Sequence, residues 1–153
     1  IAMEELPITI HGSKSLVLGF GRCGSTLARM LKALGSEVYV AARKSADLAR
    51  CYENGYVSVR YSELEKVLPQ MQIVFNTVPQ LILDSQSIGL LNKECLIVDI
   101  ATQPGGTDFQ AAEKYGIKAI LAPGLPGKVA PKTAGKVLAQ VYPGLILQEI
   151  QKV

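Results

Sequence analysis

Short apolar runs alternate with stretches of helical periodicity along most of the chain. Leu27, Leu31 and Leu34 recur at the spacing of one helix face, so a helix is expected there. Other runs have the continuous apolar character of strands that are buried on both faces, and they cover 15–18, 38–42, 56–59, 73–76, 95–99 and 118–122. This alternation predicts an α/β fold, with a doubly wound parallel sheet of about six strands and helices on both faces.

Turn and cap residues predict where the helices end. The expected helices cover 23–34, 45–54, 62–69, 85–92, 109–115 and 131–141. Glycine is common just after a helix, and it follows three of these helices, at Gly35, Gly55 and Gly116. Ser45, Ser62 and Asp108 are predicted N-cap residues, and Glu65 completes a capping box with Ser62. Pro131 suits a first helical turn.

The composition suits one compact domain with a sizeable core. Of the 153 residues, 48% are hydrophobic and 19% are charged, which argues against disorder. The net charge of +3 is too small to indicate nucleic-acid binding, and the only short basic cluster is Arg43-Lys44. No apolar run approaches the roughly 20 residues of a membrane helix, so we expect no membrane association.

The cysteines and the histidine predict neither disulfides nor a metal site. Cys23, Cys51 and Cys95 are scattered without paired spacing, as in a cytoplasmic protein with reduced thiols. His11 is the only histidine and precedes the first predicted strand, so we interpret it as structural. No cluster has the spacing of metal ligands.

A glycine-rich turn joins the first predicted strand to the first long helix. It reads Gly19-Phe20-Gly21-Arg22-Cys23-Gly24 and matches the dinucleotide-binding pattern GxGxxG. In that motif the first glycine allows a tight turn, the second lets a pyrophosphate approach the backbone, and the third lets the helix pack closely on the strand. The sequence therefore predicts a Rossmann fold, with the phosphates at the helix N-terminus.

The end of the second predicted strand favours NADP over NAD. NAD sites usually carry an acidic residue there, which binds the ribose 2′-hydroxyl. This chain has Ala42-Arg43-Lys44-Ser45 instead. An arginine can bind a 2′-phosphate with two hydrogen bonds and stack on the adenine. NAD stays open as the alternative, as does the interpretation of Arg43 as a solvated surface charge.

Loops after later strands add site candidates at the same edge of the sheet. Thr77-Val78-Pro79 is expected near the ribose, although a structural turn is nearly as good an interpretation. Ala101 and Thr102 are further cofactor candidates. Two long Gly/Pro loops follow the last strands, and their candidates for contact with an acidic substrate are Gly105, Gly106, Pro126, Gly127 and Lys132.

We interpret residues 1–12 as a linker remnant from a missing N-terminal domain, because position 1 is not Met and the first strand comes only after Gly12. Residues 13–153 are then one NAD(P)-binding domain. The sequence does not set the oligomeric state, and a homo-oligomer stays open.

Several segments together resemble the A subunits of bacterial dipicolinate synthases. Many dehydrogenases share the glycine-rich turn, so the later loops are the distinctive part of the match. The matching segments are 9–13, 18–22, 41–45, 104–109 and 122–127, and the resemblance covers nearly the whole chain.

The resemblance implies one subunit of an oxidoreductase that works with a flavoprotein B subunit. With Arg43 at the end of the second strand, we expect this oxidoreductase to be NADP-dependent. Such a protein would convert a dihydrodipicolinate-type dicarboxylate to dipicolinate during sporulation, in the cytoplasm of the mother cell. Oxidation of the ring to a pyridine removes a hydride and a proton, and the dinucleotide would accept the hydride. Neither the residues nor the resemblance identifies a catalytic acid or base.

Two other functions compete with this one. A non-catalytic domain could bind a dinucleotide and regulate a partner, since the fold alone does not fix the function; the two Gly/Pro loops favour an enzyme. A 2-hydroxyacid-type dehydrogenase would use an arginine and a histidine–carboxylate pair, and His11 is badly placed for that role.

Overall fold

The computed structural model describes residues 1–152 and contains one parallel sheet. Its strands are β1 (Lys14–Leu18), β2 (Glu37–Ala42), β3 (Val57–Arg60), β4 (Ile73–Asn76), β5 (Leu96–Asp99) and β6 (Lys118–Leu121). The spatial order is β3-β2-β1-β4-β5-β6, and every neighbouring pair is parallel. The predicted doubly wound sheet of about six strands is confirmed.

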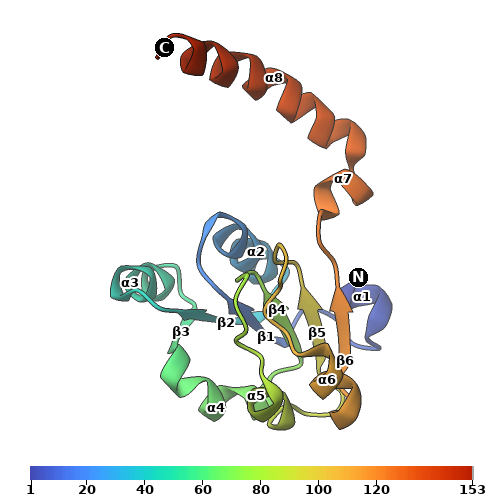
Figure 1. Cartoon of the computed structure of the whole chain (residues 1–153). Helices are drawn as coiled ribbons and strands as arrows, with labels where there is room; N and C mark the ends of the chain where they lie inside the picture. The colour runs from blue at the N-terminus through green and yellow to red at the C-terminus, as the bar shows by residue number, and fades with distance from the viewer. Residues whose placement is uncertain (153) are drawn as a thin grey trace. The chain divides into compact units, whose positions relative to one another are not determined.

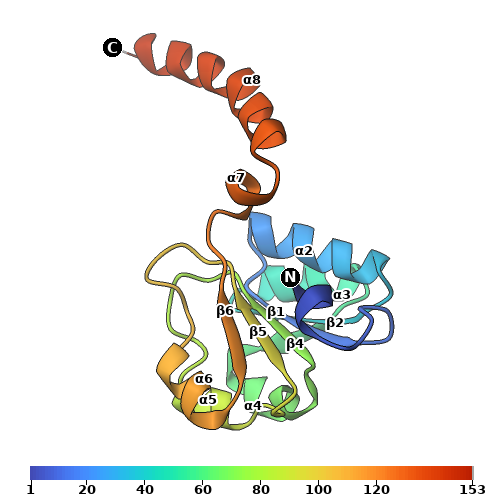
Figure 2. The ribbon, with the colours of Figure 1, turned by 90° about the vertical axis from the view of Figure 1, so that its right-hand side faces the viewer.

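Helices cover both faces of the sheet, as Figure 1 shows. One face carries α2 (Arg22–Ala33) and α3 (Ser45–Glu53), which connect β1, β2 and β3. The other face carries α4 (Leu64–Val67), α5 (Ser85–Gly89) and α6 (Phe109–Tyr115), and two 3-10 turns, η1 (Tyr61–Glu63) and η2 (Leu68–Gln70), flank α4. The turned view in Figure 2 shows the same two layers. The strand order reverses beside β1. Because the crossovers between parallel strands are right-handed, the helices of the two halves of the sheet lie on opposite faces.

The hydrophobic core fills the space between the sheet and the layer of α4, α5 and α6. Leu16 and Val74 from the strands, and Leu68 and Ile88 from the helical side, have no exposed surface. On the opposite face Ala28 and Leu31 bring α2 down onto the sheet. Burial of this apolar surface is the main source of stability and fixes the strand ends that form the site.

The register brings the strand ends level at the carboxyl edge. Leu18 of β1 pairs with Ala41 of β2 and with Asn76 of β4. The ends of β1 and β4 therefore lie side by side, and the loops that follow these two strands turn to opposite faces of the sheet. This is the switch point of the doubly wound sheet, where ligands of such folds bind.

The segment before β1 packs at the amino edge. A short helix, α1 (Ala2–Glu5), opens the chain, and Glu5 forms an ion pair of 2.5 Å with Lys118. Ile10 is buried, and the imidazole of His11 lies against Gly35. His11 is thus at the end of the sheet opposite the switch point, which confirms its predicted position.

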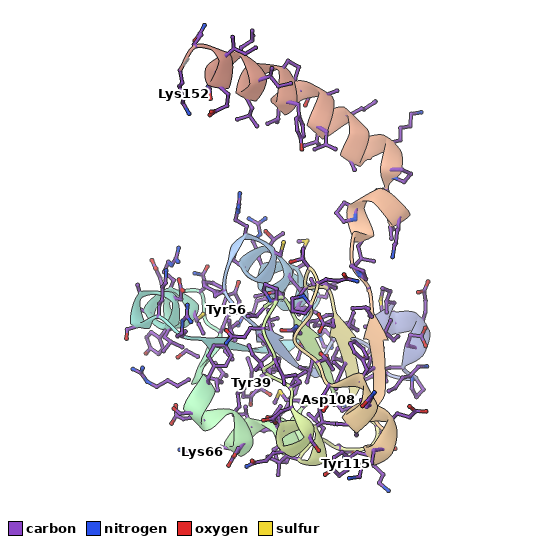
Figure 3. The ribbon with its side chains drawn as sticks, viewed as in Figure 1. Tyr39, Tyr56, Lys66, Asp108, Tyr115 and Lys152 are labelled. Carbon is purple, nitrogen blue, oxygen red and sulfur yellow. The ribbon has the colours of Figure 1, made fainter. Side chains whose placement is uncertain are left out.

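The predicted helix caps have mixed outcomes. Asp108 is confirmed, because its carboxylate accepts a hydrogen bond of 2.9 Å from the amide of Ala111 at the start of α6 (Figure 3). Ser45 is not a cap: it is the first helical residue of α3, and Lys44 precedes it. The capping box is also wrong. Ser62 lies inside η1, so its backbone is not in the extended conformation that a cap needs, and α4 begins without a side-chain cap.

One cap was not predicted from the sequence. Asp84 precedes α5, and its carboxylate accepts a hydrogen bond of 2.8 Å from the amide of Ser87. This hydrogen bond is the main cause of the lowered pKa of Asp84.

The last part of the chain, from Gly124 onwards, forms a second compact unit. It contains α7 (Leu125–Val129) and α8 (Pro131–Ile150). Pro131 stands in the first turn of α8, as predicted, but the expected end at Val141 is wrong. The helix continues past Pro143 to Ile150. The presence of α7 also shows that 122–133 is not one continuous loop. In residues 1–152 no helix combines the length and apolar content of a membrane span.

Candidate functional site

A cleft of about 730 Å³ opens at the carboxyl edge of the sheet. The segments that follow β1, β2, β3 and β4 all contribute to its wall. The predicted site residues that line it are Gly19, Phe20, Gly21, Arg22, Cys23, Ala42, Arg43, Lys44, Thr77, Val78 and Pro79. The fold thus brings together residues that are far apart in the sequence.

Gly19 turns the chain from β1 into the cleft. Its φ of +94° is unfavourable for other residues, and a Cβ atom there would lie 2.7 Å from the Oγ1 atom of Thr77. The Gly19 amide donates to the carbonyl oxygen of Ala41 at 2.8 Å, which ties the turn to the end of β2. Both the conformation and the space therefore require glycine at this position.

Gly21 and Gly24 have different surroundings. A Cβ atom on Gly24 would stand 2.1 Å from the carbonyl oxygen of Gly19, so α2 can approach the turn only because Gly24 has no side chain. A Cβ atom on Gly21 would meet no protein atom within 4 Å. Gly24 is thus needed for packing, whereas Gly21 leaves open space on the cleft side, where a bound group could approach the backbone.

The N-terminus of α2 points its amides at the cleft. Gly21 is the N-cap residue and offers no side chain, and the first turn contains no acidic residue. The first helical hydrogen bond runs from the Ser25 amide to the Gly21 carbonyl at 2.9 Å. The amides of Arg22, Cys23 and Gly24 precede that bond, so they have no acceptor within the helix. These donors, the helix dipole and the exposed Arg22 side chain fit a phosphate group.

Thr77 joins the ends of β4 and β1. Its amide and its Oγ1 atom both donate to the carbonyl oxygen of Leu18, at 3.1 and 2.8 Å. The hydroxyl proton is therefore engaged, and only the lone pairs of Oγ1 remain available to a ligand. From the sequence we expect this hydroxyl near the ribose; the structure gives it a structural hydrogen bond at the cleft wall.

Asn76 shapes the loop after β4. Its side chain is fully buried, the Nδ2 atom donates to the Val78 carbonyl at 3.0 Å, and the Oδ1 atom accepts from the Val78 amide at 3.1 Å. This closed pair of hydrogen bonds turns the chain out of the sheet before Pro79. It places Val78 and Pro79 on the wall of the cleft.

The end of β2 adds two positive charges to the cleft. Ala42 is buried, and the exposed Arg43 and Lys44 follow it on the wall. Tyr61, half-buried after β3, also lines the cleft. Burial raises the pKa of its hydroxyl, and the positive charge of Arg43 partly offsets that rise. Ser45 is exposed but does not line the cleft.

Part of the wall was not predicted from the sequence. The missed residues come from the start of α3, from the segment after β3, from the loop before α5 and from α5 itself: Asp47, Tyr61, Leu64, Glu65, Gln80, Leu81, Ile82 and Ser87. The end of β3 is at the same carboxyl edge as β1, β2 and β4, so Tyr61 could have been found from strand order. The others depend on how short helices pack, which no spacing in the sequence reports.

Asp47 brings a negative charge into this otherwise basic part of the wall. Its carboxylate forms an ion pair with Arg50, one helical turn later. The guanidinium carbon of Arg50 lies 5.9 Å from the ring centroid of Phe20, and the Phe20 ring meets Tyr56 edge-on at 6.1 Å (Tyr56 is labelled in Figure 3). Arg50 therefore links α3 to the glycine-rich turn.

Asp99 organises the loop that follows β5. The fully buried carboxylate accepts hydrogen bonds from the amides of Ala101 and Gly106, at 3.0 and 2.9 Å, and from the hydroxyl of Thr107 at 2.8 Å. These three hydrogen bonds fold the loop back toward the end of β5. None of the candidates Ala101, Thr102, Gly105 and Gly106 lines the cleft.

Gly106 has a packing role. A Cβ atom there would lie 2.5 Å from the carbonyl oxygen of Gln80, and the Gly106 carbonyl accepts from the amides of Ile82 and Leu83 at 3.0 and 2.9 Å. The loop after β5 therefore supports the loop after β4, which lines the cleft.

The remaining candidates, Pro126, Gly127 and Lys132, belong to the second unit and are exposed. Over residues 1–152, no three His, Cys, Asp or Glu side chains gather as metal ligands would. Cys51 and Cys95 are buried free thiols, and Cys23 is an exposed one.

Comparison with known proteins agrees with this geometry. The family model described as the NAD binding domain of D-isomer specific 2-hydroxyacid dehydrogenases matches residues 2–102. The chain is 51% identical over 151 residues to the A subunit of dipicolinate synthase from Bacillus subtilis (strain 168), and the match covers 99% of this chain and 50% of that protein. The chain thus spans about half the length of the curated relative that it matches.

Solved structures give the same result. The crystal structure of the Bacillus subtilis protein is 51% identical and matches with a TM-score of 0.93, over 99% of this chain and 50% of that one. The A subunit of dipicolinate synthase from Bacillus halodurans is 44% identical and matches with a TM-score of 0.92, over 94% of this chain and 50% of that one. The chain therefore belongs to the family of NAD-binding domains of the D-isomer specific 2-hydroxyacid dehydrogenases.

Proposed function

We propose that the chain is the nucleotide-binding part of an oxidoreductase that uses NADP(H). The observation that carries the proposal is the pair of exposed cations, Arg43 and Lys44, on the cleft wall at the end of β2. In this position NAD-specific domains usually have a carboxylate. NAD remains the alternative, and the experiment below distinguishes the two cofactors.

The pyrophosphate would bind at the N-terminus of α2. The amides of Arg22, Cys23 and Gly24 and the open face of Gly21 support this placement. The Arg22 side chain adds a positive charge at the same end of the helix.

The adenine would bind between the loops after β2 and β4. Apolar side chains on that part of the wall include Leu64, Val78 and Ile82, and the Tyr61 ring stands beside them. A flat aromatic base fits such a surface, and the Arg43 guanidinium can stack on its face while it binds a 2′-phosphate.

For the whole protein we propose the reaction after which its relatives are named, the synthesis of dipicolinate. A dihydrodipicolinate-type dicarboxylate would lose a hydride and a proton to become the aromatic pyridine. Bound NADP⁺ supplies the hydride acceptor in such a reaction. The residues of this chain would bind and orient the dinucleotide, while Thr77 and the loops after β4 and β5 shape the wall. Pro126 and Gly127 of α7 and Lys132 of α8 remain candidates for substrate contact.

We also propose a partner for this activity. The relatives are A subunits by name, which implies a second component of the enzyme. A flavoprotein B subunit is the proposed partner. The proposed location is the cytoplasm of the mother cell during sporulation.

A titration with cofactor fragments tests the cofactor proposal. Adenosine 2′,5′-bisphosphate and adenosine 5′-monophosphate differ only in the 2′-phosphate, and calorimetry gives both affinities. We expect the bisphosphate to bind about tenfold tighter or more, and Arg43→Ala to remove that difference. Arg22→Ala is the matched control, because it should weaken both ligands similarly. Equal affinities in the unsubstituted chain would refute the NADP proposal.

A second experiment tests the reaction. The protein and its partner are mixed with NADP⁺ and a dihydropyridine dicarboxylate, and absorbance of the reduced cofactor is followed. Cofactor binding without turnover of any such acid would favour a non-catalytic regulatory domain. Turnover of a 2-hydroxy acid would favour the third function, although His11 lies at the opposite end of the sheet.

A further inference from the structure

The Asp47–Arg50 pair has no place in the glycine-rich motif, yet it stands beside the proposed 2′-phosphate site. The Asp47 side chain lines the cleft on the same wall as Arg43 and Lys44 and is 20% exposed. Arg50 does not line the cleft, and its side chain is 62% exposed. The negative member of the pair therefore faces the cleft, and the positive member is exposed outside the cleft wall.

We propose that Arg50 is a positioning residue that determines cofactor selectivity by neutralising Asp47. This inference rests on the proposed function, because it concerns the same cleft. An unpaired carboxylate near Arg43 and Lys44 would repel a 2′-phosphate and accept a hydrogen bond from a 2′-hydroxyl, so it would favour NADH. The positive charge of Arg50 in the ion pair offsets that negative charge, so that Arg43 and Lys44 set the sign of this part of the wall.

The position of Arg50 is fixed from two sides. Its guanidinium pairs with Asp47 and stands over the ring of Phe20, which belongs to the glycine-rich turn and itself lines the cleft. Tyr56 meets the Phe20 ring edge-on, and this contact limits the rotation of the Phe20 ring. Contact with an aromatic face and a carboxylate together hold an exposed arginine more firmly than a single surface ion pair would.

The charges around the pair decide the direction of the effect. Arg43 and Lys44 are the cations of the wall near the end of β2, and Asp47 is the carboxylate that stands with them on it. Glu65 also lines the cleft, from α4, and accepts a hydrogen bond of 2.8 Å from Gln86. Loss of the Arg50 charge would therefore shift this wall toward negative potential, and a ligand that carries a 2′-phosphate would be affected more than one without it.

The test compares the affinity ratio for NADPH and NADH across four forms of the full chain, by fluorescence titration. These are the unsubstituted chain, Arg50→Gln, Asp47→Asn and the double variant. We expect Arg50→Gln to lower the preference for NADPH by about fivefold, since one full charge is exposed near the 2′-phosphate. Asp47→Asn should raise the preference by about twofold or more, and the double variant should return close to the unsubstituted ratio.

Arg50→Lys is the matched control, because it keeps the positive charge while it replaces the planar guanidinium over Phe20, and it should change the ratio by less than about twofold. A merely structural role of Arg50 would weaken both cofactors equally and leave the ratio unchanged, which would overturn the inference. A double variant that keeps the ratio of Arg50→Gln would also overturn it, because the effect would then come from Phe20. Thermal unfolding checks that Arg50→Gln folds. If that variant does not fold, the ratio measured for Asp47→Asn still tests the inference.

The two proposals fail in different ways. If the unsubstituted chain binds NADH as tightly as NADPH, the NADP assignment is wrong. The Arg50 inference is judged by the changes between variants, which can be read whatever the starting ratio is. An unchanged ratio in all four forms refutes the inference even if NADPH is preferred.

Discussion

The Cα atom of Gly24 faces the carbonyl oxygen of Gly19 so closely that a Cβ atom would stand 2.1 Å from it. The obstacle is backbone, which cannot rotate away as a side chain would. The two glycines are the first and last residues of the glycine-rich turn, so their contact sets how α2 meets β1 and where its free amides point. The proposed phosphate site therefore depends on this contact.

Gly24→Ala should lower both stability and cofactor affinity. The methyl group would force α2 away from the turn, and we expect a loss of about 1–3 kcal/mol in the free energy of unfolding, the range for overpacked sites. Urea unfolding measures this loss, and cofactor titration should show weaker binding because the amides move. Unchanged stability would mean that the turn adapts to the methyl group without strain.

Gly21→Ala should separate binding from stability. The residue has a φ of −77°, which alanine adopts freely, and its Cβ atom would meet no protein atom within 4 Å. We expect the free energy of unfolding to change by less than about 0.5 kcal/mol. The affinity for either dinucleotide should still fall by about tenfold or more, because the methyl group would occupy the space of the pyrophosphate. Unchanged affinity in this variant would show that the phosphates bind somewhere other than beside Gly21.

Asp99→Ala should destabilise the domain strongly. The substitution removes the acceptor of three buried or half-buried donors, from Ala101, Gly106 and Thr107. An unsatisfied buried donor costs about 1–3 kcal/mol, so we expect a total loss of about 3–5 kcal/mol in denaturant unfolding. Thr107→Val removes only one of the donors and is the control, with an expected loss of about 1 kcal/mol. A similar small loss for both variants would show that water replaces the carboxylate.

The thiols should react in a fixed order with iodoacetamide at mildly alkaline pH. Burial, with the negative charge of Asp47 as a smaller cause, raises the pKa of Cys51 to about 11, and burial raises that of Cys95 to about 12. Both stay protonated and enclosed, and the thiolate is the reactive form. Cys23 is exposed on the cleft wall, so it should react first, and NADPH should protect it. Mass spectrometry identifies the modified residue; labelling of Cys23 that is unaffected by saturating NADPH would place the cofactor away from α2.

The sheet and the glycine-rich turn were predictable because they depend on local and repeating signals. Six apolar runs gave the strands within a few residues of their observed bounds. Asp108 was predicted as a cap because it stands directly before a helical pattern, and its contact with the Ala111 amide is equally local.

The errors concern features that depend on distant contacts or on backbone conformation. Ser62 matched a cap pattern, but the 3-10 turn after β3 already includes it. The last helix was expected to end at Val141, yet α8 continues to Ile150. In the cleft, Asp47 and Glu65 were missed because only the packing of α3 and α4 brings them to the wall. Asp99 ends a predicted strand, but its three donors became visible only in the folded loop.

The most direct test of the proposed cofactor site is a side-by-side titration of the chain with NADPH and NADH, repeated on Arg43→Ala. We expect NADPH to bind about tenfold tighter or more, and Arg43→Ala to remove most of this preference while NADH affinity changes little. Equal or tighter binding of NADH by the unsubstituted chain would contradict the proposal, because the cations at the end of β2 would then have no role in the choice of cofactor.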